Sequence, residues 1–358
     1  MPYRHREALN DLSINVVGSV PQLNRLMANE NPNGCSPKVK DALLETLQNG
    51  PGNYPDGYST ELRSEIAAKY GVDKDDILFG NGMDEIIYML GKAFLEPGDE
   101  VVMPKLSFIS YIESTRSMGA KLVSAPMKDD LSIDLDAVLA AVTERTKYIV
   151  IVNPNNPTGT VFTESEQREF MKKVPKNVLV IMDEAYSDFY MGENYPDTYK
   201  MRKEYDNLII LKTFSKVYGL ASFRIGYMIA PKELIDTVAR VKNVFNVSAQ
   251  AMAAAVASIR DDEFTNMVID KNTACREYLY KHLDELGIFY IKSHTSFVLI
   301  DMKKNCKHIV AALKEKGYLV RPGSDFGIEN FFRVSMGTME QMEGFVEAFK
   351  EVLKEMDE

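Results

Sequence analysis

The sequence is poor in the residues that build disulfide frameworks and zinc sites. It has only three cysteines and four histidines among 358 residues, and it lacks tryptophan. Cys35, Cys275 and Cys306 lie far apart, and no Cys-x-x-Cys pair exists, which argues against both kinds of site. The sequence therefore predicts free thiols in a reducing compartment and no bound metal.

Membrane-directed and strongly basic segments are also lacking. The N-terminal residues include no apolar stretch typical of a signal peptide, and no apolar run is long enough to span a bilayer. The formal charge of −10, with acidic residues dispersed, gives no reason to expect nucleic acid or an anionic membrane as a partner. These absences predict a cytoplasmic protein.

The length and composition indicate a globular protein of more than one domain. A content of 45% hydrophobic and 26% charged residues is ordinary for soluble proteins. A chain of 358 residues exceeds the size at which a single core keeps growing, so two domains are expected.

Short apolar strands alternate with amphipathic helices through the middle of the chain. Continuous apolar runs such as 148–152 are typical of parallel strands that are covered on both faces. The alternation predicts an α/β domain with a mostly parallel, seven-stranded sheet. The expected strands are 76–79, 100–103, 121–124, 147–152, 178–182, 207–212 and 225–230. The expected helices are 60–70, 84–95, 109–118, 134–142 and 165–173.

The pattern changes after about residue 245. A long helical stretch is expected at 247–286, followed by a mixture of strands and helices that predicts a smaller α+β domain. The first 30 or so residues lack periodicity and are expected to form an arm on that second domain. The predicted large domain is therefore 31–245, and the small domain comprises 1–30 and 246–358. Its expected strands are 296–300, 318–320 and 331–334, and its expected helices are 306–316 and 339–356.

The segment 213–227 carries the most informative chemistry. A lysine amine can bond covalently to the aldehyde of pyridoxal phosphate, and hydroxyl and guanidinium groups can hold the phosphate. Lys216 is preceded by Thr213 and Ser215 and followed by Arg224. Taken alone, the window also fits an ordinary solvated lysine.

Three further segments lie where a predicted strand ends. The glycine-rich turn 79–85 opens a helix and suits a phosphate, or serves as a tight turn capped by Asp84. The segment 153–159, with two prolines and a glycine, is a rigid turn that could offer an asparagine to a ligand. Asp183 ends an apolar strand, where a carboxylate needs a cation such as a protonated pyridine nitrogen, or caps a helix. Tyr186 follows by three residues.

Two more segments allow both structural and functional interpretations. The segment 53–57 precedes a capped helix and reads as a turn. Arg333 lies inside a late apolar strand, where a guanidinium needs an anion. That anion could be a substrate carboxylate or phosphate, or the partner of a structural ion pair.

These motifs, in this order, resemble those of the fold-type I pyridoxal-phosphate-dependent aminotransferases, and most closely the histidinol-phosphate aminotransferase group. The resemblance spans nearly the whole chain and implies that family's large α/β domain and smaller α+β domain. The matching segments are 29–32, 54–56, 80–85, 153–159, 183–186, 213–227 and 333–338.

The resemblance implies a cofactor, pyridoxal 5′-phosphate, and a role for each matching residue. Lys216 corresponds to the Schiff-base lysine that also moves the substrate proton, and Asp183 to the partner of the ring nitrogen. Asn156 and Tyr186 correspond to donors to the ring oxygen, and Phe108 to the aromatic side chain that stacks on the ring. The implied phosphate ligands are Ser215, Arg224 and the backbone of Gly82, Met83 and Asp84.

The resemblance also implies substrate-binding residues, a homodimer and a specific reaction. Arg333, with Arg321 and Asn31, corresponds to the residues that bind the substrate. Tyr54 corresponds to a tyrosine that reaches the phosphate in the neighbouring subunit, which implies a homodimer. The implied reaction converts L-histidinol phosphate and 2-oxoglutarate to imidazole acetol phosphate and L-glutamate.

One departure from the family pattern concerns the amino donor. Histidinol-phosphate enzymes usually carry a Pro-Tyr motif in the N-terminal arm, but residues 14–22 contain no tyrosine and Tyr3 is too far upstream. Aromatic amino acids therefore remain alternative donors. Decarboxylation or oxidation on the same scaffold is a further alternative, because those enzymes share the lysine and the aspartate.

Overall fold

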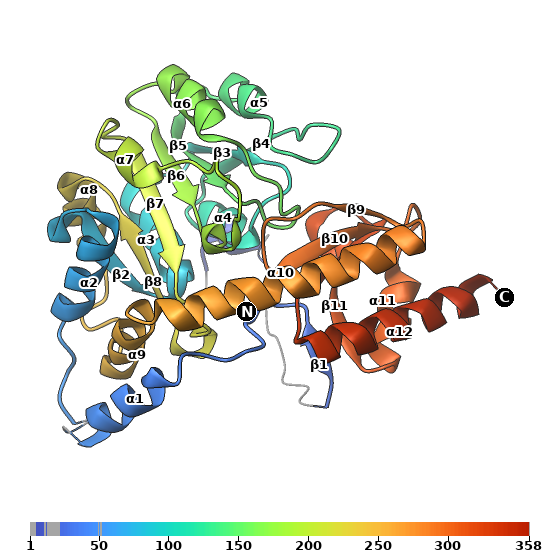
Figure 1. The fold of residues 1–358 in the computed structure, drawn as a ribbon. Helices are drawn as coiled ribbons and strands as arrows, with labels where there is room; N and C mark the ends of the chain where they lie inside the picture. Colours follow the sequence, from blue (N-terminus) through green and yellow to red (C-terminus); the bar gives the residue numbers. More distant parts are fainter. Residues whose placement is uncertain (1–4, 11, 13–21, 49, 51, 358) are drawn as a thin grey trace.

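The computed structural model describes all residues except 1–4, 11, 13–21, 49, 51 and 358. Its elements form two sheets with helices packed around each (Figure 1). The α-helices are α1 (Lys38–Gln48), α2 (Thr60–Tyr70), α3 (Gly82–Phe94), α4 (Ile109–Ser117), α5 (Leu135–Ala140), α6 (Glu164–Lys173), α7 (Thr198–Arg202), α8 (Lys232–Ala239), α9 (Ala249–Ile259), α10 (Asp262–Glu285), α11 (Lys307–Glu315) and α12 (Met339–Asp357).

The large sheet has seven strands in the order β2-β8-β7-β6-β5-β3-β4. Only β8 runs antiparallel to its neighbours, so the expected mostly parallel sheet is confirmed. Its interior strands are buried on both faces, as their continuous apolar sequences predict. The strands are β2 (Ile77–Asn81), β3 (Glu100–Pro104), β4 (Lys121–Ala125), β5 (Thr146–Val152), β6 (Leu179–Asp183), β7 (Leu208–Thr213) and β8 (Ile225–Ile229).

The small sheet has five strands in the order β1-β11-β12-β10-β9 and a core of its own. Its first strand comes from the predicted N-terminal arm and pairs in parallel with β11. Residues 14–21, which make up most of the arm segment that contains no tyrosine, lie outside the described residues. The strands are β1 (Asn24–Leu26), β9 (Phe289–Ile291), β10 (Phe297–Asp301), β11 (Tyr318–Pro322) and β12 (Phe331–Ser335).

The helical stretch predicted at 247–286 is two helices rather than one. The break lies at Asp261, whose carboxylate accepts hydrogen bonds from the Ser36 hydroxyl and, at 2.9 Å, from the Lys38 amine. These bonds tie the break to the start of α1, against which α9 packs. A tertiary contact therefore interrupts the helical period.

The long helix α10 passes from one core to the other (Figure 1). Its early residue Val268 belongs to the core of the large sheet, whereas Leu279 and Leu283 belong to the core of the small sheet. The apolar residues of α9 also lie in the large core. The boundary predicted at residue 245 stays a prediction, and this packing favours a division inside α10.

The parallel strands bring polar residues to one edge of the large sheet. Asp183, the last residue of β6, pairs in register with Val152, the last residue of β5. Thr213 ends β7, the next strand in the sheet. The carboxyl ends of parallel strands are where α/β proteins bind ligands. This edge is where the cavity described below lies.

No helix in the described part of the chain is both long enough and apolar enough to cross a membrane. The three cysteines are free thiols, and Cys275 and Cys306 are buried. Within the described residues, no three His, Cys, Asp or Glu side chains gather in a way that could hold a metal ion.

Candidate active site

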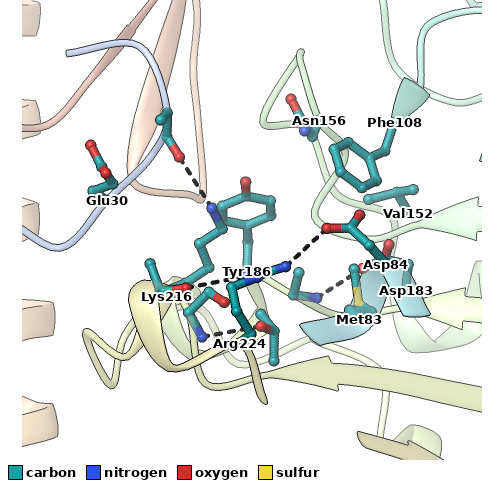
Figure 2. A pocket seen from close by; sticks show the side chains of 15 residues that line it. Glu30, Met83, Asp84, Phe108, Val152, Asn156, Asp183, Tyr186, Lys216 and Arg224 are labelled. Carbon is teal, nitrogen blue, oxygen red and sulfur yellow. Dashed lines mark hydrogen bonds and ion pairs between the residues drawn. The ribbon is translucent and has the colours of Figure 1, made fainter. Parts of the chain in front are cut away.

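A cavity of about 230 Å³ opens at the carboxyl ends of β5, β6 and β7. Figure 2 shows Lys216, Tyr186, Asp183 and Arg224 around this space, with Phe108 beside it. Most residues that the sequence predicted as site residues line it. These are Met83, Asp84, Phe108, Asn156, Asp183, Tyr186, Ser215, Lys216 and Arg224.

Lys216 follows the end of β7 and is half-buried. Its amine donates a hydrogen bond of 3.2 Å to the carbonyl of Ala28 and lies 5.6 Å from the centre of the Tyr186 ring (Figure 2). A carbonyl and an aromatic face surround the amine, and it forms no ion pair with a carboxylate in the described part of the chain. The amine therefore stays available for a bond to a ligand in the cavity.

Asp183 lies at the bottom of the cavity and is almost completely buried. Its carboxylate accepts hydrogen bonds from the Tyr111 hydroxyl at 2.9 Å and the Ala185 backbone N–H at 3.1 Å. Burial raises the pKa of Asp183 to about 6 despite these donors. A ligand that brings a protonated nitrogen to this carboxylate would offset the unfavourable burial of its charge.

The other end of the cavity suits an anion. Helix α3 begins at Gly82 and presents the first backbone groups of its N-terminus there, next to Arg224. Gly82 has φ +74, and a Cβ at this position would clash with Nη2 of Arg224. Arg224 also donates a hydrogen bond of 3.1 Å to Asp84, which lies within the first turn of α3 instead of capping it. The positive φ and the close approach of the guanidinium both favour glycine here.

The residues present fit pyridoxal phosphate. A phosphate matches the cationic Arg224, the N-terminus of α3 and the Ser215 hydroxyl. A protonated ring nitrogen matches the buried carboxylate of Asp183, and the aldehyde carbon matches the amine of Lys216. Each end of such a ligand therefore meets groups of the opposite polarity.

Arg333 lies in the wall of an adjoining cavity of about 570 Å³, which Lys216 and Tyr186 also line. It is almost fully buried, and burial lowers the pKa of its guanidinium to about 10. Nη1 donates to Oδ1 of Asn156, and Nη2 donates to the carbonyl of Met27 at 2.7 Å. Within the described residues, Nε has no hydrogen-bond partner. The charge is thus held by neutral acceptors.

Arg321 provides a second cation beside Arg333. It lies opposite Arg333 in the pairing of β11 with β12, and it lines the same cavity. Its Nε forms an ion pair of 2.6 Å with Asp325. Two guanidinium groups therefore face a cavity that leads to Lys216.

Asn31 and Tyr54 line neither of these two cavities. The amide of Asn31 donates to the Val217 carbonyl and accepts from the Asn33 backbone N–H, both at 2.9 Å. Tyr54 is 81% exposed and stacks on Phe245, with ring centroids 4.6 Å apart. The substrate contact of Asn31 and the reach of Tyr54 into a neighbouring subunit stay predictions.

Sequence reasoning gave no role to two residues that contact the predicted site residues. Tyr111 donates to Asp183, and the Asn29 amide donates to the Tyr186 hydroxyl at 2.8 Å. Asn29 has φ +55, a left-handed conformation that asparagine tolerates better than most residues. Tyr111 follows Phe108 by three residues, which is one turn of α4. The spacing of Tyr111 after Phe108 was a sequence signal that could have indicated Tyr111, whereas the conformation of Asn29 is visible only in the structure.

Comparisons with known proteins identify the family. The family model described as aminotransferase class I and II matches residues 21–349. The chain belongs to the class I and II aminotransferases. This membership confirms the enzyme class expected from the motifs, a pyridoxal-phosphate-dependent aminotransferase.

Several relatives are named histidinol-phosphate aminotransferases. The chain is 43% identical over 329 residues to a histidinol-phosphate aminotransferase of Brevibacillus brevis, covering 92% of this chain and 90% of the relative. It is 40% identical over 329 residues to the histidinol-phosphate aminotransferase of Bacillus licheniformis, covering 92% and 91%.

A solved structure supports the fold. It is the histidinol-phosphate aminotransferase of Sinorhizobium meliloti in complex with pyridoxal-5′-phosphate. The aminotransferase described here matches it with a TM-score of 0.91 and 25% identity over 99% of this chain and 98% of that one. The predicted fold-type I architecture is therefore confirmed.

Proposed function

We propose that this aminotransferase moves the amino group of L-histidinol phosphate to 2-oxoglutarate, with pyridoxal phosphate as its cofactor. The observation that carries the proposal is the buried Arg333 in the wall of a cavity that Lys216 also lines, because this cavity gives one ligand both a reactive amine and an anion site. The names of the relatives at 40–43% identity agree with this reaction.

The cavity residues would hold the cofactor by its ends. When bound, pyridoxal phosphate supplies an electron sink that stabilises negative charge on the substrate Cα. Asp183 would keep the ring nitrogen protonated, and Phe108 would be the aromatic side chain that stacks on the ring. Oδ1 of Asn156 accepts from Arg333, so its Nδ2 can donate to the ring oxygen beside the Tyr186 hydroxyl. The phosphate ligands would be Ser215, Arg224 and the backbone of Gly82, Met83 and Asp84.

Lys216 would move the proton of the reaction. With substrate bound, the Lys216 amine would accept the Cα proton as a general base. The same amine would then donate that proton on the cofactor side. The contact with the Ala28 carbonyl fixes the amine at the junction between the cofactor and substrate cavities.

The anion site favours a phosphorylated donor. Burial lowers the pKa of Arg333, and an anion held against its unpartnered Nε would offset the burial of the positive charge. A phosphate can also reach Arg321 on the neighbouring strand. The carboxylate of 2-oxoglutarate would use Arg333 in the second half of the cycle, and Asn31 is retained as a further predicted substrate contact.

We propose a homodimer in which Tyr54 reaches the phosphate of the partner's cofactor. An exposed apolar patch consisting of Tyr54, Tyr58, Val244 and Phe245 supports this arrangement, because such patches mark protein interfaces. We further propose that the enzyme works in the cytoplasm, since its three cysteines are free thiols and its substrates are soluble metabolites.

Steady-state kinetics with two donors test the function. With 2-oxoglutarate as acceptor, we expect kcat/KM for L-histidinol phosphate to exceed that for L-phenylalanine by about two orders of magnitude, as for a phosphate held by two guanidinium groups. Good turnover of phenylalanine with negligible turnover of histidinol phosphate would instead favour the aromatic amino acid enzyme. Lys216→Ala should lower kcat by at least about 10³-fold.

A further inference from the structure

The side chain of Asn29 lies between two hydroxyl groups from different parts of the fold. Its Nδ2 donates to the Tyr186 hydroxyl at 2.8 Å, and its Oδ1 accepts from the Ser335 hydroxyl at 2.7 Å. Its backbone N–H donates to the same Ser335 oxygen at 2.9 Å. Asn29 and Ser335 are each only 2% exposed, so water does not compete for these bonds.

The direction of each of these hydrogen bonds fixes the direction of the next. Because the Ser335 oxygen accepts from the Asn29 backbone, its hydrogen is available to Oδ1 of Asn29. That bond leaves Nδ2 facing Tyr186, whose oxygen must act as the acceptor. The phenolic hydrogen of Tyr186 therefore points away from Asn29, and Tyr186 lines the cavity.

We propose that Asn29 is a positioning residue that makes the Tyr186 hydroxyl a hydrogen-bond donor to the ligand, and that Ser335 fixes the Asn29 amide for this task. The inference rests on the proposed binding of pyridoxal phosphate, whose ring oxygen would receive the Tyr186 hydrogen.

The bond to Ser335 also links the site to the small sheet. Ser335 ends β12, the strand that carries Arg333, whereas Tyr186 follows β6 of the large sheet. The two residues preceding Asn29 also join this segment to both sheets. The Met27 carbonyl accepts from Arg333 of β12, and the Ala28 carbonyl accepts from Lys216, which follows β7. The donor direction of Tyr186 thus depends on the contact between β12 and the chain segment 27–29.

The substitution Asn29→Asp would reverse the direction of the hydrogen bond to the Tyr186 hydroxyl with little change in the shape of the side chain. A carboxylate has only acceptor oxygens, so it would accept from both Ser335 and Tyr186 and draw the phenolic hydrogen away from the cavity. Aspartate also tolerates a left-handed backbone such as that of Asn29. A ring oxygen that lost this donor would keep more negative charge, and that charge would raise the pH at which the nearby Lys216 nitrogen loses its proton.

A pH titration of the visible absorbance of the cofactor-bound protein tests the proposal. We expect Asn29→Asp to raise the midpoint of the spectral change by about one pH unit, and Ser335→Ala to raise it by a smaller amount. Asn24→Asp on β1 is the matched control, because it adds the same charge in the same segment without lining the cavity. Its midpoint should stay at the wild-type value.

The double variant with Tyr186→Phe decides whether Asn29 acts through the hydroxyl. In the Tyr186→Phe background, Asn29→Asp should shift the spectral midpoint much less, since the side chain at position 186 then has no hydroxyl hydrogen to redirect. An equal shift in both backgrounds, or an unchanged midpoint in the single variants Asn29→Asp and Ser335→Ala, would overturn the proposal. A wild-type protein that gains no visible absorbance with pyridoxal phosphate would instead refute the proposed function.

Discussion

At the scale of single residues, Asp183 has the clearest energetic consequence. Burial raises its pKa from 3.8 to about 6, so the folded protein without cofactor binds this proton more tightly than the unfolded chain. The stabilisation is complete below about pH 4 and is lost as the pH rises through about 6. A shift of about two units corresponds to about 2–3 kcal/mol.

Asp183→Asn should remove this loss. Without cofactor, we expect the free energy of unfolding of the variant minus that of wild type to be about 2–3 kcal/mol more positive at pH 7.5 than at pH 4.0, which means a relatively more stable variant at pH 7.5. Urea unfolding at both pH values measures it. Asp130→Asn is a control of opposite sign, because hydrogen bonds from Ser132 lower the pKa of Asp130. An Asp183→Asn difference that does not depend on pH would contradict the account.

The sequence predicted the cavity residues better than the bonds between them. Lys216 and Arg224 belong to one short motif, and Asp183 and Tyr186 to another, so local spacing was enough to indicate them. Asn29 and Tyr186 are 157 positions apart, and no local pattern predicts their hydrogen bond. Contacts of this kind depend on how the two sheets are placed.

At the scale of elements, the start of α3 tests how the phosphate is held. Gly82→Ala would place a methyl group against Arg224, so we expect the affinity for pyridoxal phosphate to fall at least about tenfold. Gly98→Ala is the matched control, because Gly98 also has positive φ but has open space around it. Absorbance titration of the cofactor-free proteins measures both affinities. Equal losses in the two variants would show that backbone strain, and not the phosphate site, is responsible.

Periodicity predicted the regular elements, and tertiary contacts decided the rest. Helix α2 begins and ends at the predicted residues, and the seven strands of the large sheet lie within two residues of their predicted bounds at each end. The helices α1, α7 and α8 were missed, as were the three-residue strands β1 and β9. Such short strands carry too few residues for a pattern, and they form because a neighbouring strand offers them partners.

At the scale of the whole molecule, the apolar patch that includes Val244 predicts a dimer. Val244 is 77% exposed, so Val244→Glu should leave the fold intact while it places a charge in the interface. We expect sedimentation to show a dimer for wild type and a shift towards monomer for the variant. Phe289→Glu on the edge strand β9 is the control, because it is similarly exposed but distant in the fold. A wild-type monomer would refute the dimer.

The alternation of strands and helices was sufficient to predict the architecture of the large sheet, whereas the domain boundary at residue 245 stays a prediction. Helix α10 contributes to both cores. The change of sequence pattern near residue 245 therefore comes earlier in the chain than the change from one core to the other. The position of Arg333 over the cavity of Lys216 likewise depends on how the small sheet sits against the large one. The substrate site is therefore a property of the whole molecule.

The most direct test of the central claim is a single half-reaction. The cofactor-bound protein is mixed with L-histidinol phosphate alone, without 2-oxoglutarate, and the cofactor is then released and identified. We predict conversion of pyridoxal phosphate to pyridoxamine phosphate in wild type and none in Lys216→Ala. Unchanged pyridoxal phosphate in wild type, under conditions where phenylalanine does convert it, would contradict the proposed function.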